Sequence, residues 1–362
     1  MKKVVLNFRS GFPGLREGFE ALGHEVIEDQ WAPEAIALEG AALCVADFVD
    51  SSRKLRRTLG LKRRLADARV PFIALNRDAP FNRGVHPTRL VLISWLKPFD
   101  GYASHSMQSA SRYAARSLYC PNAARESTYR VTAEQLAAMR DPAGYRWDVS
   151  FLGNMDATRY PEHANRVAFL AALDAMLAPL GIRTLFRDST GVPEAEQLEI
   201  IRASRVNLST IAACDAGGEP SWGLPERCYG VPACGGFLLS DRRRHAPDDF
   251  AEDERADYGD LEDCVSKIRH YLDRFGEARA NAERAHARVA LDHGYRNRAA
   301  RLLDFARGGL NSWHTQTSRQ GTPIRSNAGC IAVGIRTRSP YLPETTGVTG
   351  LESWISGREM AN

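Results

Sequence analysis

Short apolar runs alternate with amphipathic stretches along the first part of the chain. The run at residues 3–8 predicts a buried strand, and residues 15–22 predict a helix that ends at Gly23. A strand, a glycine-containing loop, a helix and a second strand within about thirty residues form the opening unit of a doubly wound sheet. Further strands are predicted at residues 25–28, 41–48, 71–75, 99–103 and 117–120, with a helix at 90–95.

A second set of elements begins at residue 147 and repeats this alternation. Apolar side chains at helical spacing predict a long helix over residues 163–180. Residues 126–146 contain no strand candidate, so the chain is predicted to form two α/β halves joined by this segment. The remaining elements of the second half are strands at 147–154, 183–186, 206–208 and 237–239 and helices at 193–204 and 226–233.

These elements predict four segments along the chain. Residues 1–125 form the first Rossmann-like domain, 126–146 a linker, and 147–310 the second Rossmann-like domain. The second domain ends with three predicted helices, at 261–275, 279–291 and 296–305. Residues 311–362 are rich in Ser, Thr, Gly and Pro and lack sustained periodicity, which predicts a flexible tail.

Composition narrows the class of protein. With 362 residues the chain is long enough for two domains, and 25% charged and 44% hydrophobic residues are ordinary for a globular protein. A formal net charge of +4 suits anionic ligands without requiring nucleic acid. Seven cysteines without a CxxC pair argue against a disulfide framework and against structural zinc. The start of the chain lacks a signal-peptide core, so we expect a cytoplasmic protein.

The segment from residue 51 to 69 alternates leucines with many arginines and lysines. One interpretation is a helix whose basic side is simply solvated. The other is a basic amphipathic helix that rests on an anionic membrane surface or an anionic acceptor. The second interpretation places the protein on the inner face of a membrane by peripheral contact.

The strongest candidate site lies between residues 203 and 241. A predicted strand ends at Ser209 and Thr210, and a polar, glycine-rich loop follows. In α/β proteins, such a loop followed by a helix start presents backbone N–H groups to a phosphate. The candidate phosphate-binding residues of this stretch are Ser209, Thr210, Gly223, Glu226, Arg227, Gly235 and Gly236.

Polar residues at predicted strand ends form the other half of the candidate site, because ligands bind at the carboxyl ends of parallel strands. Asp78 is the foremost carboxylate of the first half, and His105 is a candidate base or phosphate ligand whose simpler role is structural. Gly11 and Gly14 give only a loose phosphate-loop pattern, which a tight turn explains equally well. The predicted substrate-binding residues are Gly11, Gly14, Asn76, Arg77 and Asn154.

Several motifs, taken in order, resemble the CgeB-like (spore-maturation-protein) glycosyltransferases. The resemblance is firmest over residues 147–306. The motifs are Asp148-Val-Ser-Phe-Leu-Gly-Asn, Val206-Asn-Leu, Arg227-Cys-Tyr, Ala233-Cys-Gly-Gly-Phe-Leu-Leu and His293-Gly-Tyr-Arg-Asn-Arg.

This resemblance implies a GT-B glycosyltransferase, in which two Rossmann-like domains face each other across a cleft. It implies a nucleotide-sugar donor on the second domain as co-substrate, an acceptor (glycan, lipid-linked or protein) on the first domain, no metal and no further cofactor. An inverting reaction needs a base near the acceptor hydroxyl, and Asp78 is the first candidate and His105 the second. A retaining reaction needs no such base, and both remain open.

One position departs from the family pattern. Retaining relatives carry a glutamate that bonds to the donor ribose, and its place here is occupied by Gly230. Glu226 lies one helical turn earlier and is a candidate substitute. The departure also favours a second class, a nucleotide- or sugar-binding protein without catalytic activity.

Overall fold

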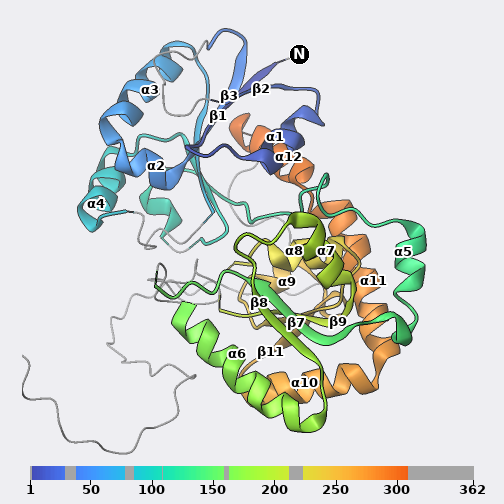
Figure 1. Cartoon of the computed structure of the whole chain (residues 1–362). Coiled ribbons are helices and arrows are strands. Elements are labelled where there is room, and N and C mark those ends of the chain that lie inside the picture. Colours follow the sequence, from blue (N-terminus) through green and yellow to red (C-terminus); the bar gives the residue numbers. More distant parts are fainter. Residues whose placement is uncertain are drawn as a thin grey trace, which may run out of the picture. The chain divides into compact units, whose positions relative to one another are not determined.

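The computed structural model describes residues 2–28, 38–77, 85–107, 109–158, 163–211 and 223–308. Its strands form two separate parallel sheets, one of six strands and one of five (Figure 1). The predicted α/β class with two Rossmann-like domains is therefore confirmed. Asp78 and the predicted tail 311–362 lie outside the described residues.

The first sheet has the strand order β2-β1-β3-β4-β5-β6. All of its pairs are parallel. The inner strands β1, β3, β4 and β5 are short and largely buried, as expected where helices cover both faces of a parallel sheet, whereas the edge strand β2 is not buried. The strands are β1 (Lys3–Asn7), β2 (Glu25–Glu28), β3 (Ala41–Asp47), β4 (Phe72–Asn76), β5 (Gly101–Ser104) and β6 (Ser117–Tyr119).

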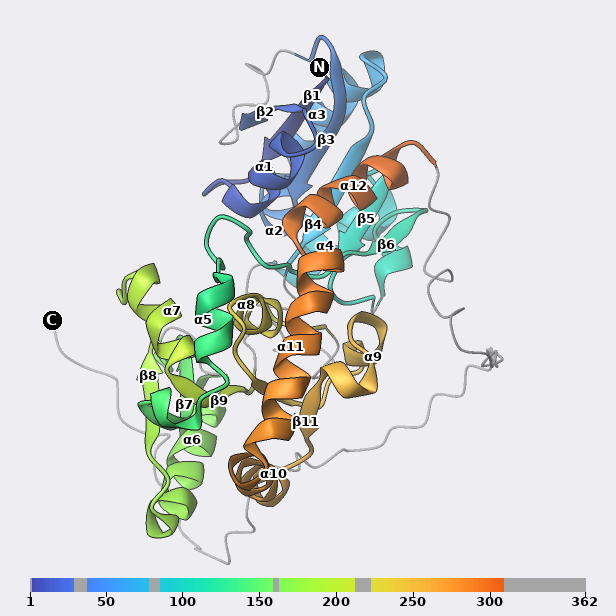
Figure 2. The same ribbon diagram turned by 90° about the vertical axis from the view of Figure 1, so that its right-hand side faces the viewer.

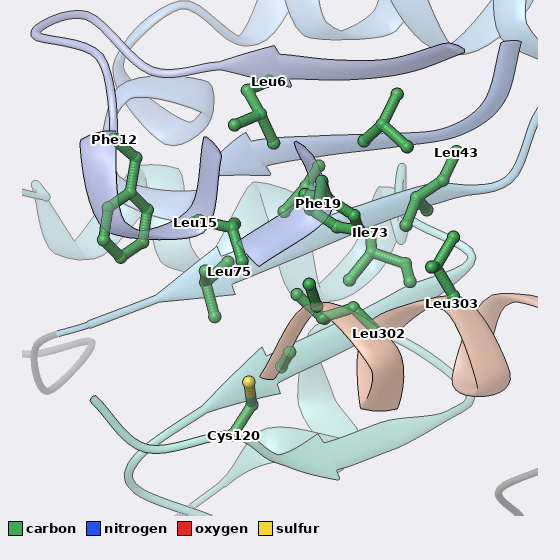
Figure 3. Close-up of a cluster of buried hydrophobic side chains, with 14 of the residues drawn as sticks. Leu6, Phe12, Leu15, Phe19, Leu43, Ile73, Leu75, Cys120, Leu302 and Leu303 are labelled. Carbon is green, nitrogen blue, oxygen red and sulfur yellow. The ribbon is translucent and has the colours of Figure 1, made fainter. Parts of the chain in front are cut away.

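Two groups of helices cover the two faces of the first sheet. One face packs against α1 (Pro13–Glu20) and α12 (Tyr295–Ala306), in a core that includes Leu15, Ile73 and Leu302 (Figure 3). The other face packs against a second core of apolar side chains. The helices of this second layer are α2 (Phe48–Arg53), α3 (Leu55–Asp67) and α4 (Pro87–Leu96).

The basic segment predicted as one helix over residues 51–69 forms two helices. Lys54 interrupts the run with φ −111° and ψ 42°, between α2 and α3. Asp47 caps α2 by accepting a hydrogen bond from the backbone N–H of Asp50 at 2.7 Å. The break lets α2 pack at the end of β3 while α3 continues along the sheet.

The second sheet has the order β11-β10-β9-β7-β8, also with parallel pairs throughout. Sequence reasoning missed its edge strand β11, which has three residues and no sustained apolar pattern. The strands are β7 (Trp147–Gly153), β8 (Thr184–Asp188), β9 (Ser204–Ser209), β10 (Leu238–Asp241) and β11 (Ala256–Tyr258). The helices are α5 (Ala133–Ala138), α6 (His163–Leu177), α7 (Glu194–Arg202), α8 (Arg227–Ala233), α9 (Ala246–Asp249), α10 (Leu261–Asp273) and α11 (Phe275–Asp292).

The last helix belongs to the first sheet, although the sequence placed it in the second domain. Leu302, Leu303 and Phe305 of α12 are buried in the same core as α1, and Figure 2 shows α12 beside the first sheet while α11 lies in the second domain. The chain returns at residue 294, where Gly294 pairs with Ala124 in a parallel bridge. The assignment of residues 295–306 to the second domain is thus corrected, because their apolar side chains complete the core of the first.

Candidate functional site

The carboxyl edge of the second sheet gathers the residues of the candidate donor site. Gly153 ends β7, Ser209 ends β9 and Asp241 ends β10, so the three lie along one edge. The helix α8 starts at Arg227 on this edge, as expected for a helix that follows a parallel strand. Residues 212–222 of the loop before it lie outside the described residues.

Arg227 lies at this edge beside the end of β7. Its guanidinium carbon lies 4.4 Å from the centroid of the Phe151 ring, and a Cβ on Gly153 would meet its Nη2 at 2.2 Å. No hydrogen bond or ion pair joins this guanidinium to any other residue that the structure describes, Glu226 included. Loss of hydration, and then the charge of Arg166, lower the pKa of Arg227 to about 10.

Arg166 brings a second positive charge to the same ring. This side chain comes from α6, is buried, and lies 5.6 Å from the Phe151 centroid. Its Nε donates to the carbonyl oxygen of Ile211 at 2.9 Å, and its Nη1 donates to that of Asn154. Backbone carbonyl oxygens orient Arg166, and its charge lowers the pKa of Arg227, so an anion at Arg227 would relieve the repulsion between the two cations.

Glu226 lies at this edge within electrostatic range of two arginines, Arg77 and Arg125. The carboxylate keeps contact with solvent, but the surrounding protein raises its pKa, against the opposing effects of Arg77 and Arg125. Arg77 follows β4 in the first domain, and its guanidinium carbon lies 4.4 Å from the Phe12 ring centroid. The predicted substrate-side Arg77 and the predicted donor-side Glu226 are therefore close enough to interact electrostatically.

Gly223 and His105 also meet across the two domains. A Cβ on Gly223 would lie 2.4 Å from both the carbonyl oxygen and Cδ2 of His105, whose side chain is buried at the end of β5. The Gly223 carbonyl accepts a hydrogen bond from Arg243 Nη1 at 2.9 Å. Arg243 in turn donates to both carboxylate oxygens of Asp241, at 2.8 and 3.2 Å. This buried pair fixes the end of the glycine loop against His105.

The other predicted polar residues of the second sheet make hydrogen bonds or contacts with neighbouring protein groups. Thr210 is buried, and its carbonyl oxygen accepts from Arg166 Nε at 3.3 Å. The Ser209 hydroxyl, also buried, lies 3.8 Å from the Cys228 sulfur. Asn154 Oδ1 accepts from the backbone N–H of Asp156 at 2.8 Å and so shapes the turn after β7. Their part in ligand binding stays a prediction.

Gly235 and Gly236 do not lie at the donor edge, which corrects their predicted role. Helix α8 runs away from the carboxyl edge, so these glycines at its far end lie beside the start of β10. Gly235 has φ +78°, and a Cβ there would meet Leu136 Cδ2 at 2.4 Å. Their function is to end the helix and to allow close packing.

On the first sheet, the tight-turn and packing interpretation fits the two glycines. Gly11 has φ +70°, which a turn requires. Gly14 is buried, and a Cβ there would meet Tyr295 Cδ2 at 2.4 Å, so α12 covers the place that a substrate would need. Asn76 is buried as well and donates from Nδ2 to the Tyr102 hydroxyl at 2.9 Å.

The structure explains why residue 230 is a glycine. The ring of Tyr129 fills the space beside it, with Cζ 2.6 Å and the hydroxyl oxygen 2.9 Å from the place of a Cβ. Burial raises the pKa of Tyr129, and so does the neighbouring charge of Glu226. Sequence reasoning missed Tyr129, Phe151, Arg166 and Arg243, although Phe151 lies within the Asp148-to-Asn154 motif.

In the part of the chain that the structure describes, no group of three or more His, Cys, Asp or Glu side chains is arranged to hold a metal ion. No described helix is both long enough and apolar enough to cross a bilayer.

Part of the chain is similar in sequence to a known family of proteins. Residues 129–304 match the family model described as glycosyl transferase-like. A sequence comparison with curated proteins gives no match.

Three solved structures share the arrangement of the two domains. Anabaena HepE in complex with UDP superposes with a TM-score of 0.54 at 12% identity, over 85% of this chain and 100% of that one. HepE in complex with UDP-glucose gives 0.53 at 12% identity, over 85% and 100%. Sucrose-phosphate synthase from Thermosynechococcus elongatus gives 0.55 at 13% identity, over 85% and 99%. At these identities the likeness establishes the fold, which is the GT-B fold.

Proposed function

We propose that this protein is a glycosyltransferase that moves a sugar from a nucleotide-sugar donor to an acceptor. The observation that carries the proposal is the guanidinium of Arg227. It is stacked on Phe151 at a strand-end edge, beside Arg166, without an ion pair to any described residue. The match to a glycosyl transferase-like family model and the UDP in HepE support a nucleoside diphosphate as its partner.

In this proposal the two arginines stabilise the leaving group. Transfer breaks the bond between the anomeric carbon and the diphosphate oxygen, and the diphosphate keeps the electron pair. Its negative charge grows in the transition state, where Arg227 makes a direct contact and Arg166 adds a fixed positive field. Arginine charge at this edge is the basis for proposing metal-independent transfer without a further cofactor.

Glu226 is the proposed contact of the donor ribose. Its carboxylate remains accessible to solvent at the start of α8, and the surrounding protein raises its pKa. A carboxylate in this place can accept hydrogen bonds from ribose hydroxyls. Glu226 would thereby supply the contact that the glycine at position 230 leaves out.

The acceptor, whether a glycan, a lipid-linked molecule or a protein, is proposed to bind on the first domain near Arg77. This side chain extends from the end of β4 to within electrostatic range of Glu226. In an inverting reaction the base would be Asp78, which follows Arg77 in the chain and lies outside the described residues, or His105. His105 is buried against Gly223, so its ring needs a local opening to meet an acceptor.

The proposal is tested by calorimetric titration with UDP, GDP and ADP, followed by transfer assays with the matching nucleotide sugars in the presence and absence of EDTA. We expect one nucleoside diphosphate to bind and Arg227→Ala to weaken that binding. Equal binding by wild type and variant, with both folded, would remove Arg227 from the site. Transfer that stops when EDTA is added would overturn metal independence.

A nucleotide- or sugar-binding protein without transfer activity is the second candidate, and Tyr129 favours it. The Tyr129 ring fills the space beside Gly230, the position at which the family resemblance implies a glutamate in retaining relatives. Binding of a nucleoside diphosphate without hydrolysis or transfer, across a broad panel of donors and acceptors, would identify this second function.

A further inference from the structure

Helix α4 of the first domain carries an apolar face that is open to solvent. Its side chains Val91, Leu92, Trp95 and Leu96 are all exposed, and Trp95 is 79% exposed. These four positions are spaced so that they lie on one side of the helix, opposite the buried Ile93. Exposed apolar side chains are ordinary when single, but four on one helix face mark an interaction surface.

The neighbouring helix α3 supplies a dense positive charge. Residues 53–64 contain seven arginines and lysines and no acidic residue. Of these, Arg56 and Arg63 point outward and are exposed, while Leu61 and Leu65 are buried against the sheet. This stretch is the basic segment that the sequence singled out, and the candidate donor site does not use it.

The basic and the apolar surfaces belong to the same layer. Leu61 of α3 and Ile93 of α4 lie in one core cluster, so both helices cover the same face of the first sheet and turn their outer sides away from it. Arg89 Nη1, at the start of α4, donates to the carbonyl oxygen of Arg53 at 3.0 Å and ties the helix to the end of α2. Figure 1 shows α3, α2 and α4 together on this face.

We propose that the outer sides of α3 and α4 dock onto the surface of a membrane rich in anionic lipids. An amphipathic tryptophan among aliphatic side chains suits the boundary between headgroups and acyl chains. The arginines of α3, a helix in the same layer, are attracted to anionic headgroups, at about 1 kcal/mol for each cation near the surface. The exposed Arg56 and Arg63 favour an anionic lipid surface over an uncharged apolar partner, whereas Arg53 and Lys62 already pair with Asp50 and Asp100. The sequence predicted membrane contact through the basic segment 51–69 alone. The proposed surface adds the apolar side chains of α4, which would insert among the lipids.

The experiment is flotation of the full chain with vesicles of phosphatidylcholine alone or with about one third phosphatidylglycerol, at low and high salt. We expect binding to the anionic vesicles only, weakened by salt because screening shortens the reach of the charges. Leu92→Ser/Trp95→Ser and Arg56→Glu/Arg63→Glu should each lower the partition coefficient by at least about tenfold. Brominated lipid should quench tryptophan fluorescence in the wild type, and the part of this quenching that is lost with Leu92→Ser/Trp95→Ser should report the insertion of Trp95.

Matched changes elsewhere serve as controls. Leu291→Ser removes a side chain that is 69% exposed on α11, and Arg269→Glu/Arg274→Glu reverses two exposed charges on the second domain. These should leave vesicle binding within about twofold. All variants should keep wild-type nucleotide binding, so this result is independent of the proposed transfer.

Equal loss in the control variants, equal binding to neutral vesicles, or no binding would each overturn the proposal. A change of molecular mass in solution caused by Leu92→Ser/Trp95→Ser would instead assign the α4 face to a second copy of the chain, and would overturn it as well.

Discussion

The ring of Tyr129 lies against Gly230 so closely that a Cβ at residue 230 would be 2.6 Å from the ring carbon Cζ. We expect Gly230→Glu to destabilise the protein by about 1–3 kcal/mol, because the added side chain has no space. Tyr129→Ala/Gly230→Glu should recover much of this loss, which thermal unfolding would measure. Gly276→Glu is the control, since nothing lies within 4 Å of a Cβ there. Additive effects of the two changes would contradict the steric explanation.

Arg227→Ala should weaken binding of the nucleoside diphosphate by about 1.5–3 kcal/mol, or about ten- to 150-fold, as for a charge-assisted contact. Arg227→Lys should recover only part of the affinity, because an ammonium group cannot stack on the Phe151 ring as a guanidinium does. Calorimetric titration measures both variants, with Arg269→Ala as the matched control for net charge. If Arg227→Lys binds as tightly as wild type, stacking of the guanidinium on the Phe151 ring does not contribute to nucleotide affinity.

Gly223→Ala should destabilise the protein by about 1–3 kcal/mol, since its Cβ would lie 2.4 Å from the His105 carbonyl oxygen. The clash involves backbone, so it cannot be relieved by rotation of a side chain. Gly276→Ala, at an open position of α11, should leave stability unchanged or raise it by up to about 1 kcal/mol. Urea unfolding compares the two, and equal stabilities would show that Gly223 and His105 are not in close contact in solution.

Stability should fall below neutral pH because of His293. Burial, and then the charge of Arg298, lower the pKa of this histidine from 6.5 to about 4. Arg298 Nη2 donates to His293 Nδ1 at 3.0 Å, and Nε2 contacts the Asp249 carbonyl oxygen at 2.7 Å, so only the neutral ring satisfies both bonds.

The unfolded chain therefore binds more protons than the folded one between pH 4 and about 6.5, and the contribution to stability is lost as pH falls through this window. Urea unfolding at pH 7 and pH 5 should differ by about 2 kcal/mol on account of this group. His293→Gln removes the titration and should reduce the difference. The same pH dependence in wild type and variant would refute the role of His293.

Most strands could be predicted from the sequence because both sheets are parallel and covered on both faces. A strand buried in this way, such as β4 (Phe72–Asn76), leaves a continuous apolar run between polar loops. Strand β11 was not predicted because three residues are too few to form a pattern. The break between α2 and α3 at Lys54 was not predicted because the amphipathic spacing continues through it.

The candidate site could be predicted only where its residues are neighbours in the chain. Glu226 and Arg227 were found because they follow the glycine loop directly. Tyr129 and Arg166 were missed because their positions depend on how distant segments pack, which no local pattern records. Gly235 and Gly236 were misplaced for the opposite reason: they are near Arg227 in sequence, but the length of α8 separates them from it.

The crossing of α12 back to the first sheet has a consequence for the order in which the chain folds during synthesis. Leu302, Leu303 and Phe305 close one face of the first sheet, and a Cβ on Gly101 would already collide with the Phe305 ring at 2.4 Å. A nascent chain that has emerged only to residue 290 therefore lacks the helix that, together with α1, covers one face of its first sheet. Completion of the domain that is made first must therefore wait for α12, the last helix that the structure describes, so neither domain can be finished long before the other.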